Sequence, residues 1–245
     1  MKRIMIDVGH GGKDLGAVAN GLAEKELNLR VGLKIRDYLK GYEVETAMTR
    51  ESDIDLKPID RIMLVTSFNP DLCVSIHHNS ADGKARGAEV IHAYYDKSDD
   101  KLAEDILSRL KTAGMPSRRA FTKLNAENKD WYYMIRSIWD SDTKAIIVEG
   151  GFLDNPEDAK LLKDESFIAA EAGCISEAII AYFGIGKKEG KADTTENTAA
   201  WGDKYIERLR ELGLINGEHK SGDNMIWAEF ASVMVNLMDK YNMKS

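Results

Sequence analysis

Four side chains of this 245-residue sequence stand where a predicted strand gives way to a loop or a helix, and their types suit metal-assisted chemistry. They are His10, Glu24, His77 and Glu149. Two histidines and one carboxylate are the ligand set of a catalytic zinc site, which keeps a fourth position for water and substrate. The second carboxylate is then available for proton transfer. Zinc would lower the pKa of its bound water and polarise a carbonyl, so this set predicts hydrolysis of an amide.

Each of these residues also has a structural interpretation. A histidine or glutamate at a strand end is often a hydrogen-bonded or capping residue, and Glu24 at a helix start is favoured by the helix dipole. The four positions are separated by 14, 53 and 72 residues, and these separations match no compact zinc motif such as His-Glu-x-x-His. Residue types and spacing therefore leave both interpretations open.

The elements that must position these residues follow an α/β pattern. Short apolar runs that end in glycine-rich or polar turns alternate with segments of helical period, which is typical of a mainly parallel twisted sheet flanked by helices. We expect such a domain over residues 1–184, with strands over residues 3–8, 43–48, 72–77, 88–93 and 145–149. Helices are expected to begin near Glu24, Pro58, Asp99, Pro156 and Ser166. Open α/β sheets bind ligands at the carboxyl ends of their strands, where the four candidate residues fall.

Charge and hydropathy exclude two classes of partner. The chain has 34 basic and 41 acidic residues, a formal net charge of -7, and no basic stripe for nucleic acid. Its first apolar stretch is broken at Asp7, before a secretory signal could form, and no window approaches about 20 uninterrupted apolar residues. We therefore expect no signal peptide and no membrane span, and synthesis in the cytoplasm.

The composition changes after the α/β pattern ends. Residues 185–198 are charged and rich in small side chains, which predicts a linker. Residues 199–245 show two amphipathic helical segments around a glycine-containing turn. A helical module of this size is marginally stable alone, so we expect it to pack on the first domain, on a second copy or on a wall polymer.

Five sequence blocks, in order, resemble the zinc N-acetylmuramoyl-L-alanine amidases of the Amidase_3 type, which include phage endolysins and bacterial autolysins. The blocks are IDVGHGGKDLGA at residues 6–17, GLAEKELNL at 21–29, TRESD at 49–53 followed by Arg61, DLCVSIHHNS at 71–80 and VEGGFLDN at 148–155. The resemblance covers nearly all of residues 1–184. It implies that His10, Glu24 and His77 bind one zinc ion and that Glu149 is the general base.

Other polar residues near these blocks have less definite roles. His78 is an alternative ligand, but strand order and the His-x-Asn spacing to Asn79 favour His77. Asn79 is expected either to help hold the peptide of the substrate or orient a ligand, or to cap a turn. Arg50 and Arg61 are expected to be structural and to pair with acids such as Asp53 and Asp60, whereas His92 and His219 are interpreted as non-catalytic. We expect residues 131–134 in the core or in the wall of a cleft.

The resemblance implies hydrolysis of the amide between N-acetylmuramic acid and L-alanine in peptidoglycan, and thus lysis of the cell wall. Two alternatives stay open: a zinc peptidase acting within the stem peptide, and a wall-binding protein without activity. A chain without a signal peptide would reach the wall through a holin-type membrane lesion, as a phage endolysin does, or when a mother cell lyses.

The C-terminal segment has a resemblance of its own. Residues 203–217 and 227–234 are similar to one S-layer-homology-type repeat, which implies binding to a secondary wall polymer. Trp227 departs from the arginine usual in that family, and one copy is present where three commonly act together. The alternative is a helical hairpin that packs on the amidase or dimerises.

Overall fold

A computed structural model describes residues 1–96, 99–138, 142–188 and 210–211 of the chain. The chain divides into two compact units, Met1–Lys188 and Glu189–Ser245. The helical module expected over residues 199–245, with its S-layer-homology-type repeat, lies outside the described residues except for Arg210 and Glu211. The described structure is therefore almost entirely that of the first unit.

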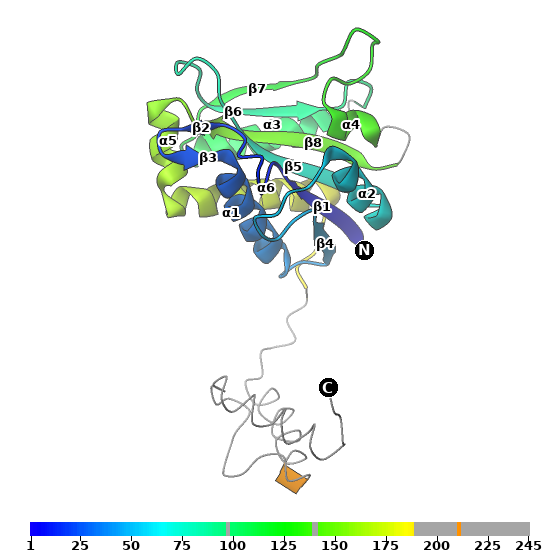
Figure 1. Cartoon of the computed structure of the whole chain (residues 1–245). Helices are drawn as coiled ribbons and strands as arrows, with labels where there is room; N and C mark the ends of the chain where they lie inside the picture. The colour runs from blue at the N-terminus through cyan, green and yellow to red at the C-terminus, as the bar shows by residue number, and fades with distance from the viewer. Residues whose placement is uncertain (97–98, 139–141, 189–209, 212–245) are drawn as a thin grey trace, which may run out of the picture. The chain divides into compact units, whose positions relative to one another are not determined.

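A six-stranded sheet forms the centre of this unit, in the order β4-β1-β5-β8-β6-β7 (Figure 1). The strands are β1 (Lys2–Val8), β4 (Val44–Met48), β5 (Leu72–Asn79), β6 (Ala88–His92), β7 (Ser117–Phe121) and β8 (Lys144–Phe152). Strands β4, β1, β5 and β8 are parallel, β6 is antiparallel to β8, and β7 is parallel to β6. Strands β2 (Val18–Ala19) and β3 (Leu22–Ala23) form a separate antiparallel pair. The predicted α/β fold with a mainly parallel sheet is confirmed.

Helices cover both faces of the sheet because both sets of alternating strand residues are apolar. Ile4, Val74 and Val148 point to one face and form a core with helices α1 (Glu24–Leu39), α3 (Asp100–Thr112), α5 (Pro156–Lys163) and α6 (Glu165–Phe183). Met5 and Cys73 point to the opposite face, where α2 (Pro58–Phe68) and α4 (Tyr133–Ser137) complete a smaller core. The sheet is thus buried on both sides, as expected for an α/β domain.

Among the described helices, α6 has the length and apolar composition needed to cross a membrane. It also carries Glu171 and Glu177, and it packs Ile168 and Ile175 into the larger core. These are the contacts of a core helix. Glu171 and Glu177 interrupt its apolar run, so the helix contains no stretch of about 20 uninterrupted apolar residues.

The first unit continues a few residues past the end of α6. Gly184 caps the helix in the left-handed conformation, with φ 62°, and the next residue, Ile185, is 9% exposed. The backbone N–H of Glu43 then donates to the carbonyl of Gly186 at 2.9 Å, and that of Lys188 to the carbonyl of Gly41 at 2.9 Å. The first part of the segment expected to be a linker therefore belongs to the first unit.

Candidate active site

His10, Glu24 and His77 come together at the carboxyl ends of β1 and β5, where α1 begins. One possible ligand atom from each residue lies within 4.8 Å of the other two. The carboxylate of Glu24 lies between the imidazoles, with 3.1 Å from Oε2 to Nε2 of His10 and 2.9 Å from Oε1 to Nδ1 of His77. The two rings meet edge to face with centroids 5.0 Å apart. This cluster is able to hold a metal ion.

The loop after β1 gives His10 its position. His10 has a φ of 58°, in the left-handed region that non-glycine residues rarely adopt. The Arg61 guanidinium donates to the His10 carbonyl at 2.5 Å, which holds the backbone in this conformation. The preceding residue must be glycine, because a Cβ at Gly9 would overlap the ring of His77. Contacts from β5 and α2 therefore hold the backbone of His10 in this strained conformation.

Glu24 is fixed by the first turn of α1 and is 5% exposed. Its carboxylate accepts hydrogen bonds from the backbone N–H of Ala17 at 2.9 Å and of His78 at 3.2 Å. Burial by itself would raise the pKa of Glu24, but hydrogen bonds and charge interactions with His10 and His77 outweigh burial and hold that pKa well below its usual range. Glu24 is therefore an anion, as a metal ligand must be.

A second carboxylate orients the imidazole of His10. Nδ1 of His10 lies 2.8 Å from Oδ2 of Asp14, so an N–H there leaves the lone pair on Nε2 facing Glu24. Burial lowers the pKa of His10, but Glu24 and then Asp14 raise it to about 9. Two acceptors 3.1 Å apart need a proton or a cation between them, and metal-bound histidines commonly donate their other N–H to a carboxylate. The donor set thus fits a divalent cation.

His78 does not join the cluster. Successive strand residues point to opposite faces, so His78 faces α1 and α6 while His77 faces the site. The His78 ring is 0% exposed, and its Nδ1 lies 2.8 Å from Oδ1 of Asn28. Its Nε2 lies 3.4 Å from the buried carboxylate of Glu171. The structure therefore brings His77, and not His78, to His10 and Glu24.

Glu149 lies on β8, directly paired with His77 of β5. Burial raises the pKa of Glu149, and the negative charges of Glu24 and Glu89 raise it further, against the lowering effect of His77 and His78. Within the described part of the chain, no hydrogen bond or ion pair engages its side chain, which keeps partial access to solvent. A carboxylate with a raised pKa beside a possible metal site suits proton transfer near neutral pH.

Asn79 ends β5 on the same face as His77. Its Oδ1 accepts from the backbone N–H of Ser80 at 2.9 Å, which is the turn-capping role expected of asparagine. Its Nδ2 donates to Oε2 of Glu89, a buried residue of β6, at 3.1 Å. One amide hydrogen of Asn79 is thereby directed along the sheet, and the other is available to a ligand.

Arg50 and Arg61 are buried, with exposed fractions of 2% and 4%, as expected of structural residues. The acids predicted to pair with them were wrong. Arg61 pairs with Asp7 of β1 at 2.9 Å rather than with Asp60. Arg50 donates to backbone carbonyls, at 2.9 Å to Gly9 and 2.7 Å to Lys25. Both arginines therefore secure the loop that carries His10.

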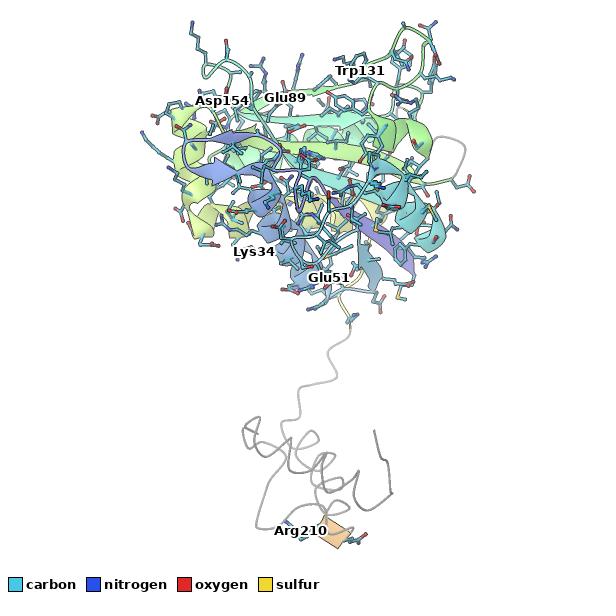
Figure 2. All side chains as sticks on the ribbon, viewed as in Figure 1. Lys34, Glu51, Glu89, Trp131, Asp154 and Arg210 are labelled. Carbon is cyan, nitrogen blue, oxygen red and sulfur yellow. The ribbon has the colours of Figure 1, made fainter. Side chains whose placement is uncertain are left out.

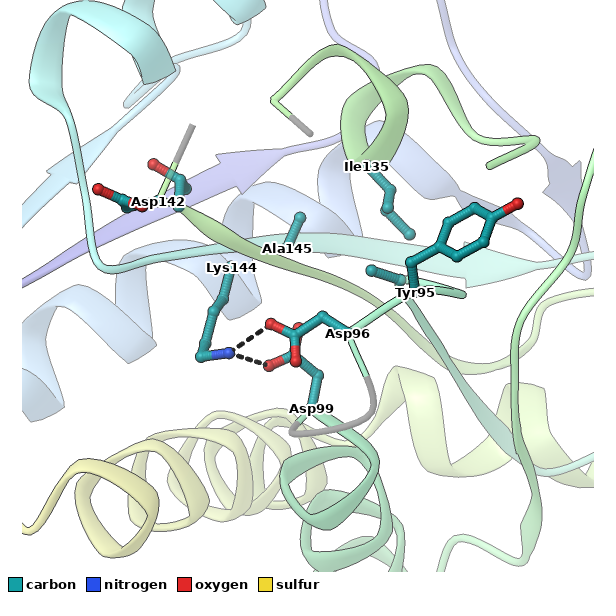
Figure 3. Close-up of a pocket in the computed structure, with 9 residues that line it drawn as sticks. Tyr95, Asp96, Asp99, Ile135, Asp142, Lys144 and Ala145 are labelled. Carbon is teal, nitrogen blue, oxygen red and sulfur yellow. Dashed lines mark hydrogen bonds and ion pairs between the residues drawn. The ribbon is translucent and has the colours of Figure 1, made fainter. Parts of the chain in front are cut away.

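Other residues considered in the sequence lie away from the cluster. His92 lies in β6, with Nδ1 at 3.1 Å from Asp100. Met134 is buried in the smaller core, whereas Trp131 is 51% exposed. A separate pocket of about 290 Å³ lies beside Lys144 at the beginning of β8, where Lys144 contacts Asp96 and Asp99 (Figure 3). Glu149 comes five positions after Lys144, so the two residues are about 16 Å apart along the strand. This pocket is therefore not part of the site.

The fold and the site define a hydrolase of the α/β class, with a cluster able to hold a metal ion and a separate carboxylate. The N-acetylmuramoyl-L-alanine amidase family, Amidase_3, matches residues 4–181, and the chain belongs to this family. The chain is 33% identical over 198 residues to an endolysin of Bacillus phage SPP1, covering 77% of this chain and 69% of the endolysin.

Two further relatives extend the comparison. A germination-specific N-acetylmuramoyl-L-alanine amidase of Bacillus subtilis (strain 168) is 32% identical over 200 residues, which cover 74% of this chain and 80% of the relative. The solved catalytic domain of CwlV, an N-acetylmuramoyl-L-alanine amidase from Bacillus(Paenibacillus) polymyxa var.colistinus, superposes with a TM-score of 0.65 at 28% identity. That match covers 75% of this chain and 99% of the CwlV domain.

Proposed function

We propose that this chain hydrolyses the amide bond between N-acetylmuramic acid and L-alanine in bacterial peptidoglycan, with one zinc ion and Glu149 as general base. The observation that carries the proposal is the clustering of His10, Glu24 and His77 beside Glu149, in a chain whose residues 4–181 match the amidase family. Peptidoglycan is the substrate class because the relatives are N-acetylmuramoyl-L-alanine amidases and endolysins.

Zinc is the ion we assign to the cluster. Two imidazoles and one carboxylate suit zinc and leave a coordination position for water. When bound, zinc would supply Lewis-acid polarisation of the scissile carbonyl and a lower pKa for the attacking water. His10, Glu24 and His77 would be its ligands, and Asp14 would fix the orientation of His10.

Glu149 has the proton-transfer role. Its carboxylate takes a proton from the attacking water and delivers it to the nitrogen of the departing L-alanine, because an amine must be protonated to leave. Its raised pKa helps the first half of this cycle, since a carboxylate with a raised pKa is a stronger base toward the attacking water. Asn79, whose amide nitrogen donates one hydrogen to Glu89, would donate the other to a carbonyl of the substrate.

The chemical test is mass spectrometry of purified walls digested by the chain. Amidase action releases muramic acid without its peptide and creates free N-termini on L-alanine, with peptides of full length. Shortened stem peptides would instead identify a peptidase, and unchanged walls would identify a binding protein without activity. Either of these results contradicts the proposal.

We predict that Asp14→Asn weakens zinc binding by about tenfold to a hundredfold, the usual effect of removing a carboxylate that orients a histidine ligand. The asparagine keeps the size of the side chain but provides less negative charge to His10. Competition with a chromophoric chelator measures the affinity. The exposed residue Asp60 provides the control variant Asp60→Asn, which should leave affinity unchanged. Equal affinities of the two variants would remove Asp14 from the metal site.

For residues 199–245 we infer an anchoring role at a secondary wall polymer, based on the resemblance to an S-layer-homology-type repeat. The endolysin relative supports access to the wall through a holin-type lesion, and release at mother-cell lysis is the alternative route. Genomic neighbourhood separates these two routes.

We predict that truncation after Lys188 lowers binding to intact walls by about tenfold or more, through loss of a second attachment. Turnover of a soluble muramoyl peptide should stay within about twofold of the full chain, because the first unit is compact without residues 189–245. Truncation after Gly184 is a less suitable test, since it also removes the contacts of Gly186 and Lys188. Sedimentation with purified walls gives the measurement, and unchanged binding would contradict the anchoring role.

A further inference from the structure

A row of paired residues crosses four neighbouring strands at the level of the site. His77 of β5 pairs with Glu149 of β8, Glu149 pairs with Glu89 of β6, and Glu89 pairs with Arg119 of β7. Directly paired residues point to the same face of a sheet, and neighbouring strands are about 4.8 Å apart. The backbone of Arg119 is therefore two strands, about 10 Å, from that of Glu149.

Glu89, which is labelled in Figure 2, is the buried centre of a charged cluster in this row. It is 3% exposed, and its Oε1 accepts from Nε of Arg118 at 2.6 Å and from Nε of Arg119 at 2.8 Å. Its Oε2 accepts from Asn79 at 3.1 Å. Two guanidinium groups therefore face the carboxylate of Glu89.

An irregularity in the β6–β7 pairing allows both arginines to reach the same carboxylate. Ala88 pairs with Ser117 and Glu89 with Arg119, so Arg118 is an extra residue in the ladder. Such a bulge changes the direction of a side chain, and bulges are frequent beside active sites. Consecutive strand residues would otherwise point to opposite faces.

The two guanidinium groups are held in place but remain accessible. The side chains of Arg118 and Arg119 are 42% and 54% exposed. Arg118 lies over the ring of Phe152 at 5.5 Å, and Arg119 over that of Phe121 at 4.1 Å. A guanidinium has five N–H donors, and in the described part of the chain each of these two uses only Nε in a hydrogen bond. Their terminal N–H groups are thus available to an anion.

We propose that Arg118 and Arg119 bind a free carboxylate of the peptide leaving group, at the second residue after the scissile amide. This inference rests on the proposed amidase function. Glu149 protonates the leaving nitrogen, so the first residue of the departing peptide lies beside Glu149 of β8. From there the row of paired residues continues to Arg119 of β7, away from His77. An extended peptide spans about 3.5 Å per residue, so its second residue reaches the neighbourhood of Glu89 and the two arginines.

The ligand is a carboxylate because of charge and shape. Arginine binds a carboxylate through two parallel hydrogen bonds, and such charge-assisted pairs are stronger than neutral ones. Glu89 occupies only Nε of each guanidinium, so the terminal N–H groups are the donors for this carboxylate.

Two soluble substrates that differ by one charge test the proposal with the full chain. They are N-acetylmuramoyl-L-alanyl-D-glutamine, whose α-carboxyl is free and whose γ-carboxyl is an amide, and the same compound with its α-carboxyl also converted to an amide. We expect the chain to prefer the free acid by about tenfold to a hundredfold in kcat/KM, as for loss of a charge-assisted hydrogen bond. In the double variant Arg118→Gln/Arg119→Gln this preference should disappear, while the rate for the amide should change less than about threefold.

Arg109→Gln, on α3, is the matched control and should keep the full preference, since its partners Asp105 and Glu177 lie outside this row. A double variant that still prefers the acid overturns the proposal. So does an equal loss for both substrates, because it would mean that the arginines only support Glu89 and Asn79. The single variants Arg118→Gln and Arg119→Gln give the same comparison if the double variant does not fold.

A binding measurement separates this proposal from the amidase function itself. The full-length Glu149→Gln variant should bind the free acid about tenfold or more tightly than the amide in isothermal titration calorimetry. If the wild type cleaves neither compound while this difference in Kd persists, the amidase proposal fails and the carboxylate site stands. If the variant binds the two compounds equally and the wild type cleaves them normally, the carboxylate site fails and the amidase proposal stands.

Discussion

Glu149→Gln should reduce kcat on peptidoglycan by about a hundredfold to ten-thousandfold, the contribution usual for a positioned general acid or base. Glutamine has nearly the shape of glutamate but cannot accept the proton of the attacking water. Because Glu149 is placed outside the His10, Glu24 and His77 cluster, the variant should still bind one zinc ion per chain. Wall turbidity assays and metal analysis provide the two measurements.

The control for this substitution is Glu104→Gln, at an exposed position of α3, which should retain full turnover. Wild-type chain treated with a chelator provides a second inactive reference, and added zinc should restore its activity. A Glu149→Gln variant with near-normal lysis would contradict the mechanism. A variant that loses zinc would instead make Glu149 part of the metal site.

We expect the same residue to set the acidic limit of activity. The base must be ionised to accept a proton, and burial together with Glu24 and Glu89 raises its pKa. Turnover should therefore decline as the pH falls through this raised pKa, at a higher pH than an unperturbed glutamate would give. Lysis at a series of pH values, with zinc occupancy measured in parallel, separates this effect from loss of the metal.

Much of the fold, and the edge of the sheet at which His10, Glu24 and His77 lie, could be predicted from the sequence, because the responsible signals are local. The apolar run of β5 ends at a histidine, and the run of β8 leads into Glu149 and a glycine pair, so both residues fall at the carboxyl edge of the sheet. Alternation along β5 also separates His77 from His78. Glycines mark the loop of His10, where close approach of His77 excludes a Cβ from Gly9.

The features that escaped prediction depend on long-range pairing or on weak local patterns. Strand β7 is the edge of the sheet, and its first three residues, including Arg118 and Arg119, are exposed, so it shows no apolar alternation. Glu89 is a buried acid of β6, and its two arginine partners are 29 and 30 residues away in the sequence. Helix α4 has only 5 residues, too few for a helical period to be visible.

Arg61 illustrates the same limit and leads to the second large effect. Its partner Asp7 is 54 residues away in the sequence, whereas Asp60 is adjacent, so proximity in the sequence favoured the wrong acid. In the structure Asp7 is 1% exposed and also accepts from Ser75 at 2.5 Å and from Thr49 at 3.0 Å. This buried network joins β1, β5 and α2 beneath the loop that carries His10.

We expect Arg61→Met to lower the free energy of unfolding by about 3–5 kcal/mol, because it leaves the carboxylate of Asp7 buried without its cation. Urea unfolding followed by circular dichroism measures this change. Arg109→Met, which breaks a more exposed ion pair with Glu177, should cost no more than about 1 kcal/mol. An Arg61→Met variant as stable as Arg109→Met would show that the buried pair does not stabilise the fold.

The double variant Asp7→Asn/Arg61→Met distinguishes the unpaired charge from the lost packing. It contains no buried charge at this position, so it should recover part of the stability that Arg61→Met loses, and the difference from additivity measures the coupling of the two residues. Zinc affinity should remain reduced in both variants, because a methionine side chain cannot donate to the carbonyl of His10 and the strained φ of 58° loses that support. Stability and metal binding would then respond to the same arginine through different atoms: the carboxylate of Asp7 and the carbonyl of His10.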